Sequence, residues 1–207
     1  IGITGSNGKT MVKEWLYQLL SDDFRIVRSP RSYNSQIGVP LSVWSLSENS
    51  ELGIFEGGIS QMNEMENLQP IIQPTIGIFT NIGDAHQEGF GGLKQKADEK
   101  VKLFTDAEVL IYNSDEKLIE ISIVQANLKA KLFSWGKKNN AELQVLNIEK
   151  NSTAKIDLKY KNQSFSVEIP FTDDASIENA LQCVCVLLCF DFPKEIIAQK
   201  LLKLEPV

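Results

Sequence analysis

The first twenty residues, IGITGSNGKTMVKEWLYQLL, contain the pattern that decides the fold. An apolar run at residues 1–4 leads into a glycine-rich turn at residues 5–8. After the turn, apolar side chains recur at helical spacing, at Val12, Trp15, Leu16, Leu19 and Leu20. The pattern predicts a strand, a loop and a helix in that order, which is the opening unit of an α/β fold.

The rest of the chain continues this alternation. Further β-rich runs lie at residues 24–27, 52–55, 75–79 and 109–112, and helical patterns lie at 93–104, 176–190 and 194–204. Short alternating runs between residues 132 and 171 indicate an antiparallel hairpin. We therefore expect an α/β fold with a P-loop-type, mostly parallel sheet flanked by helices, and a small antiparallel hairpin region near 132–171.

Composition narrows the class of protein. A chain of 207 residues can form one large domain, and it has no apolar run of about 18 residues that would span a membrane. No signal peptide is visible, so we expect a cytoplasmic protein. The net charge of −6 argues against a nucleic-acid surface. The three cysteines, at 183, 185 and 189, lack metal-ligand spacing and are expected to be buried apolar residues.

The glycine-rich turn has the residues needed to hold phosphate. Backbone N–H groups of such a turn, together with a helix N-terminus, can surround phosphate oxygens, while a lysine adds charge and a threonine hydroxyl can bind Mg²⁺. The general phosphate-loop pattern has an additional glycine where this chain has Ile3. We predict that the nucleotide-binding residues are Gly5, Ser6, Asn7, Gly8, Lys9 and Thr10.

Two further residues follow predicted strands. Glu56 ends an apolar run and precedes two glycines, a position from which a carboxylate can reach a metal at the carboxyl edge of a parallel sheet. A solvated carboxylate at a strand end is the alternative. His86, the only histidine, lies in a glycine-rich loop after another strand, where either a functional or an ordinary role is open.

Four segments together resemble the Mur ligases, which build the peptide of bacterial cell-wall precursors. They are the loop at residues 4–10, the NSQIGVP segment at 34–40, Glu56, and the loop from Asn81 to His86. The likeness spans residues 1–207 as the family's central ATP-binding domain. The stretches EGGISQ at 56–61 and AHQEGFG at 85–91 are similar to the family branch that adds D-alanyl-D-alanine.

The resemblance implies an activity. It implies an ATP-dependent acid–amino-acid ligase that adds D-alanyl-D-alanine to UDP-MurNAc-tripeptide through an acyl phosphate. ATP and Mg²⁺ are the implied cofactors, with Lys9 and His86 in catalysis and Thr10, Glu56 and His86 as metal ligands. Asn179 matches an asparagine that contacts adenine, although Ala175 stands where the family often has a histidine.

Lys100 is the third residue to which the resemblance assigns a catalytic role. Residues 100–104, KVKLF, match a family pattern in which the lysine is carbamylated and supports a second metal ion. Spacing alone is equally compatible with an ordinary solvated lysine on a charged helix.

The resemblance also implies that other parts of the protein lie outside this chain. An N-terminal domain that binds the uridine nucleotide and a C-terminal domain are expected to be absent here, and in some bacteria an alanine racemase is fused as well. The chain's abrupt ends agree with this expectation. Three alternatives follow: a folylpolyglutamate synthase-like ligase, a nucleotide-binding module inactive in isolation, and a GTP-binding switch. The switch is disfavoured because the chain has no N-K-x-D segment.

Overall fold

The structure is a computed structural model that describes residues 1–83 and 89–207. Its strands are β1 (Gly2–Thr4), β2 (Ile26–Arg28), β3 (Leu52–Glu56), β4 (Ile76–Phe79), β5 (Val109–Asn113), β6 (Lys131–Gly136), β7 (Leu143–Lys150), β8 (Ala154–Tyr160) and β9 (Gln163–Ile169). Its helices are α1 (Lys9–Leu20), α2 (Gly38–Val43), α3 (Glu64–Ile72), α4 (Leu93–Val101), the 3₁₀-helix η2 (Lys102–Phe104), α5 (Lys117–Ala126), α6 (Asp174–Cys189) and α7 (Lys194–Leu201).

The strands form one sheet in the order β2-β3-β1-β4-β5-β6-β7-β8-β9. Strands β2 to β7 of this order pair in parallel, and only β7-β8-β9 are antiparallel. The predicted fold class is confirmed. The antiparallel part is shorter than the predicted 132–171 region, because α5 returns the chain so that β6 extends the parallel sheet.

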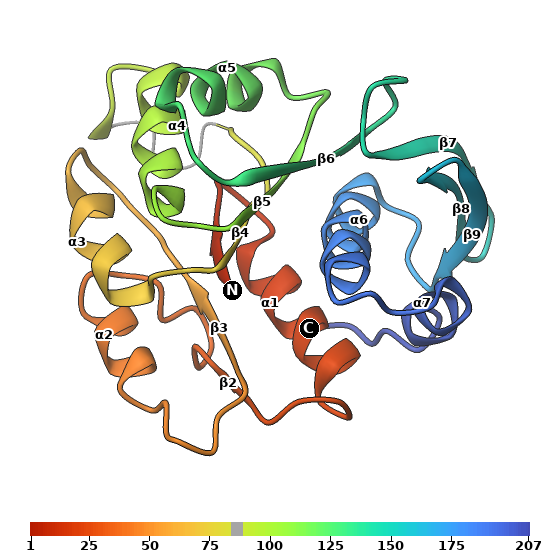
Figure 1. Cartoon of the computed structure of the whole chain (residues 1–207), viewed down its shortest axis with the longest axis horizontal. Helices are drawn as coiled ribbons and strands as arrows, with labels where there is room; N and C mark the ends of the chain where they lie inside the picture. The colour runs from red at the N-terminus through yellow and green to blue at the C-terminus, as the bar shows by residue number, and fades with distance from the viewer. Residues whose placement is uncertain (84–88) are drawn as a thin grey trace.

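Helices cover both faces of the parallel sheet (Figure 1). Alternate side chains of a strand point to opposite faces, so neighbours in sequence enter different cores. Ile54, Ile78 and Ile111 pack in the core that includes α1, α6 and α7. Their neighbours Phe55, Phe79 and Tyr112 pack in a second core with α3, α4 and α5. The antiparallel strands curl past α6 and α7 at the other end of the molecule (Figure 1).

The cysteine prediction is confirmed in the first core. Cys183 and Cys185 are fully buried on α6, and Cys189 is half-buried, with no disulfide among them. Burial raises the pKa of the Cys189 thiol to about 11, so this side chain stays protonated at neutral pH. Among the helices of residues 1–83 and 89–207, none has the length and apolar character needed to cross a membrane.

Sheet register is what assembles the candidate site. Ile3 of β1 lies opposite Glu56 of β3 on one side and Ile78 of β4 on the other. The parallel strands therefore end together, and the segments that follow them meet at one edge of the sheet. The glycine-rich loop follows β1, and Thr80 and Asn81 follow β4.

Candidate active site

The loop between β1 and α1 is held tightly against the segment after β4. Ser6 N donates to Asn81 O at 2.9 Å, and Asn7 N donates to Asn81 Oδ1 at 2.9 Å. Two glycines allow this close packing. Gly5 and Gly8 have φ angles of +151° and +81°, and a Cβ would lie 1.9 Å from Thr80 Oγ1 or 2.3 Å from Asn179 Oδ1.

Lys9 begins α1 and folds back over the loop. Its Nζ donates to Gly5 O at 2.8 Å and to Ser6 O at 3.2 Å. Burial lowers the pKa of Lys9, as does Lys96 to a smaller extent, while Glu56 raises it. A half-buried ammonium beside a glycine loop and a helix N-terminus forms a site suited to phosphate.

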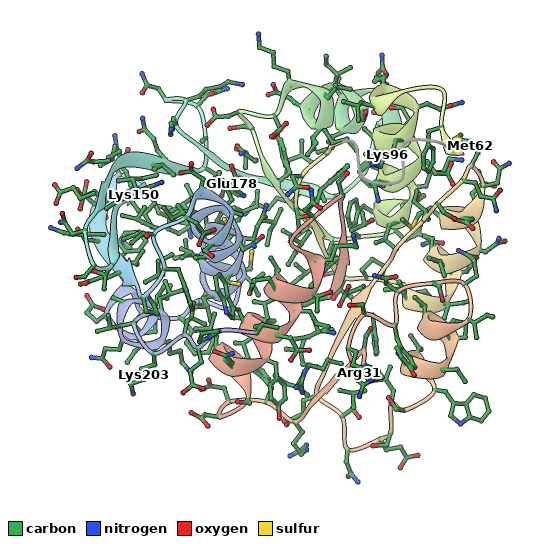
Figure 2. All side chains as sticks on the ribbon, turned by 180° about the vertical axis from the view of Figure 1, so that it is seen from behind. Arg31, Met62, Lys96, Lys150, Glu178 and Lys203 are labelled. Carbon is green, nitrogen blue, oxygen red and sulfur yellow. The ribbon has the colours of Figure 1, made fainter. Side chains whose placement is uncertain are left out.

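Helix α4 brings two more lysines to this edge of the sheet, Lys100 to the glycine loop and Lys96 to the segment after β4. Lys100 Nζ donates to Gly5 O at 3.0 Å, and Lys96 Nζ donates to Gly83 O at 2.5 Å. Both side chains are buried, which excludes the reading of Lys100 as a solvated surface lysine. Figure 2 shows Lys96 on α4, well away from Lys150 and Lys203 at the other end of the molecule.

The pKa of Lys100 is strongly lowered. Burial lowers the pKa of Lys100 to about 7, and the neighbouring charges of Lys9 and Lys96 contribute to the shift. The three lysines line a cavity of 290 Å³ together with the loop and with residues 34–37 and 58–60. Positive charge thus gathers at a polar cavity, an arrangement suited to a polyanionic ligand.

Glu56 lies beside this cavity, at the end of β3. Its carboxylate is fully buried, so it is not the solvated strand-end group of the alternative reading. Thr10 Oγ1 donates to Glu56 Oε2 at 3.0 Å, and Asn34 Nδ2 donates to the same oxygen at 3.3 Å. A hydroxyl and a carboxylate next to a phosphate loop are hard oxygen donors, and their pairing fits Mg²⁺.

Asn179 approaches the loop from α6 on its other side, next to Gly8. A further cavity of 620 Å³ lies beside α6, where Ile177 and Glu178 face Asn113 and Asp115 of the segment after β5. Glu178 lies toward the middle of the molecule (Figure 2). Helix α6 thus contacts the glycine loop through Asn179 and lines a space large enough for a planar ring system through Ile177 and Glu178.

The structure brings together most of the predicted site residues, namely Gly5, Ser6, Asn7, Gly8, Lys9, Thr10, Glu56, Lys100 and Asn179. His86 lies outside the described residues. In the part of the chain that is described, no three His, Cys, Asp or Glu residues form a group that could hold a metal ion.

Sequence reasoning missed three contributors. Lys96 precedes Lys100 by one helical turn, and that spacing could have placed both on one face of the helix. The sequence indicates Asn81 only as part of the segment that ends at His86. In the structure its side chain caps the loop by accepting from Asn7 N. Lys13 follows Lys9 by one turn and is completely buried against Glu56, with Nζ 2.9 Å from Glu56 Oε1.

Comparison with known proteins agrees with this geometry. Residues 3–187 match the family model described as the Mur ligase middle domain. The chain belongs to the Mur ligase family.

Two curated relatives of this Mur ligase chain share a name. UDP-N-acetylmuramoyl-tripeptide--D-alanyl-D-alanine ligase of Bacillus subtilis is 28% identical over 198 residues, covering 94% of this chain and 42% of the relative. The protein of that name from Borreliella burgdorferi is 31% identical over 194 residues, covering 91% and 40%. The chain thus spans less than half the length of these relatives.

Solved structures share the fold. MurF from Acinetobacter baumannii superposes with a TM-score of 0.86 at 24% identity, covering 100% of this chain and 46% of that one. MurF ligase from Thermotoga maritima, solved in complex with ADP, gives a TM-score of 0.83 at 20% identity, covering 100% and 48%.

The perturbed lysine makes a prediction about stability and pH. The pKa of Lys100 is about 7 in the folded chain and near 10.5 in the unfolded chain. Burying this side chain therefore lowers the free energy of unfolding, and the loss is greatest below pH 7, where the buried group is charged. This loss of stability decreases as the pH rises toward 10.5. We expect Lys100→Met to raise the free energy of unfolding by a few kcal/mol at pH 6.5 and by much less at pH 9.5.

Urea unfolding at several pH values measures this difference. The matched control is Lys117→Met, which alters an exposed lysine on α5 and should give no such pH-dependent gain. A stability gain in Lys100→Met that is the same at every pH would contradict the assignment.

Proposed function

We propose that residues 1–207 form the central ATP-binding domain of a ligase that adds D-alanyl-D-alanine to UDP-MurNAc-tripeptide. The observation that carries the proposal is the hydrogen bond of half-buried Thr10 to the buried Glu56 carboxylate, at 3.0 Å, beside a glycine loop with three converging lysines. The shared name of the curated relatives supports the choice of substrates. ATP would supply a phosphoryl group to the tripeptide carboxylate, and the amine would then displace it from the acyl phosphate.

The described residues suit this reaction. Backbone N–H groups of residues 5–8 and the N-terminus of α1 would hold the phosphates, and Lys9 would contact them directly. Thr10 and Glu56 would hold Mg²⁺, which neutralises phosphate charge when bound. Lys96 and Lys100 add positive charge where the transferred phosphoryl would lie, and charge stabilisation dominates the catalysis of such transfers.

Lys100 has a second possible state. A lysine with a pKa of about 7 has a substantial fraction of uncharged amine near neutral pH, and such an amine can attack CO₂. The reaction forms an N–C bond, releases one proton and leaves a carbamate anion. In that state Lys100 would support a second metal ion, for which His86 is the other predicted ligand.

The adenosine end of ATP has a suitable space. The cavity beside α6 is lined by Ile177 and Glu178, and Asn179 of the same helix lies beside Gly8 of the loop. We infer that Asn179 contacts the base, as the family resemblance implies, and that the phosphates run from there along the loop toward Glu56.

The chain spans less than half the length of its relatives, which supports the proposal that it is part of a longer protein. We propose that a uridine-nucleotide-binding domain precedes this domain and that another domain follows it, with a fused racemase possible in the parent. An exposed apolar row on α2 agrees with this proposal. Ile37, Leu41 and Trp44 are 75%, 62% and 89% exposed at helical spacing, and Ile37 also lines the cavity. The isolated chain would then bind nucleotide weakly and ligate little.

Replacement of the loop lysine tests nucleotide binding. Lys9→Ala removes a charged hydrogen-bond donor, so we expect ATP affinity to fall by about 10- to 100-fold or below detection. Isothermal titration calorimetry of the 207-residue chain measures this. Lys203→Ala, at the far end of the molecule, should bind as the wild type does (Figure 2). Unchanged affinity in Lys9→Ala would remove the basis of the proposal.

Phosphate release tests the substrates. The parent protein is given ATP with UDP-MurNAc-tripeptide and D-alanyl-D-alanine in one reaction, and ATP with folate and glutamate in another. We expect release only in the first reaction. Release only in the second reaction would contradict the proposed substrates and indicate a ligase of folate metabolism. Release in neither reaction would indicate a nucleotide-binding module without ligase activity.

Carbamylation has a direct spectroscopic test. With ¹³C-labelled bicarbonate near pH 8, we expect a protein-bound carbamate signal in the ¹³C NMR spectrum of the wild-type chain. The signal should be absent in Lys100→Met and present in Lys96→Met. A spectrum without the signal, or a signal that survives Lys100→Met, would rule out this state of Lys100.

A further inference from the structure

Lys13 is a charged residue in an unusual place. It lies one helical turn after Lys9 on α1 and is completely buried, whereas lysines are almost always exposed at their charged end. Its ammonium donates to Ser29 O at 2.8 Å and to Arg31 O. The same nitrogen lies 2.9 Å from Glu56 Oε1 and 3.1 Å from Glu14 Oε1. A buried ammonium is tolerated only with such complete pairing.

The two oxygens of Glu56 have separate partners. Oε1 faces Lys13 and receives no well-directed hydrogen bond from the described residues. Oε2 faces the loop, where it accepts from Thr10 and Asn34. The ion pair with Lys13 therefore fixes the rotation of the carboxylate and leaves Oε2 next to the Thr10 hydroxyl.

Lys13 is itself held by a row of alternating charges. Glu14 lies between Lys13 and Arg28, whose Nε donates to Glu14 Oε2 at 2.9 Å. The Arg28 guanidinium in turn stacks 3.4 Å from the ring centre of Tyr17. Two carboxylates alternate with two cations from the partly exposed Arg28 inward to Glu56, so the row has no net charge. This arrangement keeps the Lys13 ammonium at one position.

We propose that Lys13 is a positioning residue for the divalent cation. By occupying Oε1, it presents Oε2 of Glu56 to the cation beside Thr10, and it balances the charge of a buried carboxylate when no cation is bound. The inference rests on the proposed function, since it assumes that Thr10 and Glu56 hold Mg²⁺ with ATP. It assigns a role to a side chain that does not touch the nucleotide or the metal.

A purely structural ion pair makes a different prediction. Buried pairs often contribute little net stability, and loss of one partner then destabilises the fold without a specific effect on a ligand. If Lys13 positions Glu56, its removal must weaken the effect of Mg²⁺ on ATP binding and leave metal-free ATP binding intact. Lys9 and the loop remain unchanged in that variant.

The experiment measures ATP affinity of the 207-residue chain by calorimetry, once with EDTA and once with excess Mg²⁺. The ratio of the two affinities reports the cation site. We expect Lys13→Met to lower this ratio by about tenfold or more, the effect of losing one oriented charged ligand, while metal-free affinity stays within about twofold.

Lys102→Met is the matched control. Lys102 also pairs with a fully buried glutamate, Glu99, at 2.8 Å, but that carboxylate lies away from the loop and accepts from Met65 N. Its removal should also cost stability, to a smaller extent because the Lys102 side chain is 34% exposed, and should leave the affinity ratio unchanged. Glu14→Gln removes one anchor of Lys13 without touching Glu56, and it should lower the ratio to a smaller extent.

The outcomes separate the two proposals. A wild-type chain whose ATP binding does not respond to Mg²⁺ would overturn the proposed cation site, and this inference with it. A wild-type response that persists in Lys13→Met would overturn the inference alone, as would an equal loss of affinity with and without Mg²⁺. If Lys13→Met does not fold, an unchanged ratio in Glu14→Gln overturns the inference.

Discussion

The parallel pairing of β1 with both β3 and β4 is the constraint on which the rest of the structure depends. It aligns the ends of three strands, so the glycine loop, Glu56 and Asn81 meet at one edge of the sheet. Because β1 is central, both of its faces are buried, and Ile3 has no exposure at all. The loop can then approach its neighbours only with glycine at positions 5 and 8. Fold and site thus share one geometric origin.

Charge at this edge is arranged in two layers. Nearest the cavity, Lys9, Lys96 and Lys100 present positive charge to it, and burial together with the neighbouring lysines lowers the pKa of Lys100 to about 7. Behind them, Glu56 and Lys13 form a pair that is already neutral. The first layer suits phosphate and the second suits a cation ligand of fixed orientation.

The sequence predicted those parts of the fold that depend on residues close together in the chain. A tight loop joined to a buried helix requires closely spaced glycines followed by apolar residues at helical spacing. Residues 1–20 therefore sufficed to predict β1, the glycine loop and α1. Helix α2 has only six residues with Pro40 inside, which is too short for periodicity to reveal. The helical pattern predicts that α6 begins at residue 176. The helix begins at Asp174, because Asp173 caps it by accepting from Ser176 N at 2.8 Å. The parallel partner of β6, and the burial of Lys13 and Lys96, depend on segments far away in the sequence, which no local pattern records.

A crystal structure of the chain with a non-hydrolysable ATP analogue and Mn²⁺ tests the central claim most directly. Mn²⁺ gives an anomalous signal and accepts the same oxygen donors as Mg²⁺. The account predicts one anomalous peak at about 2.0–2.3 Å from both Thr10 Oγ1 and a Glu56 oxygen, with the triphosphate over residues 5–9. The absence of an anomalous peak beside Thr10 and Glu56, or a triphosphate that lies away from this loop, would contradict it.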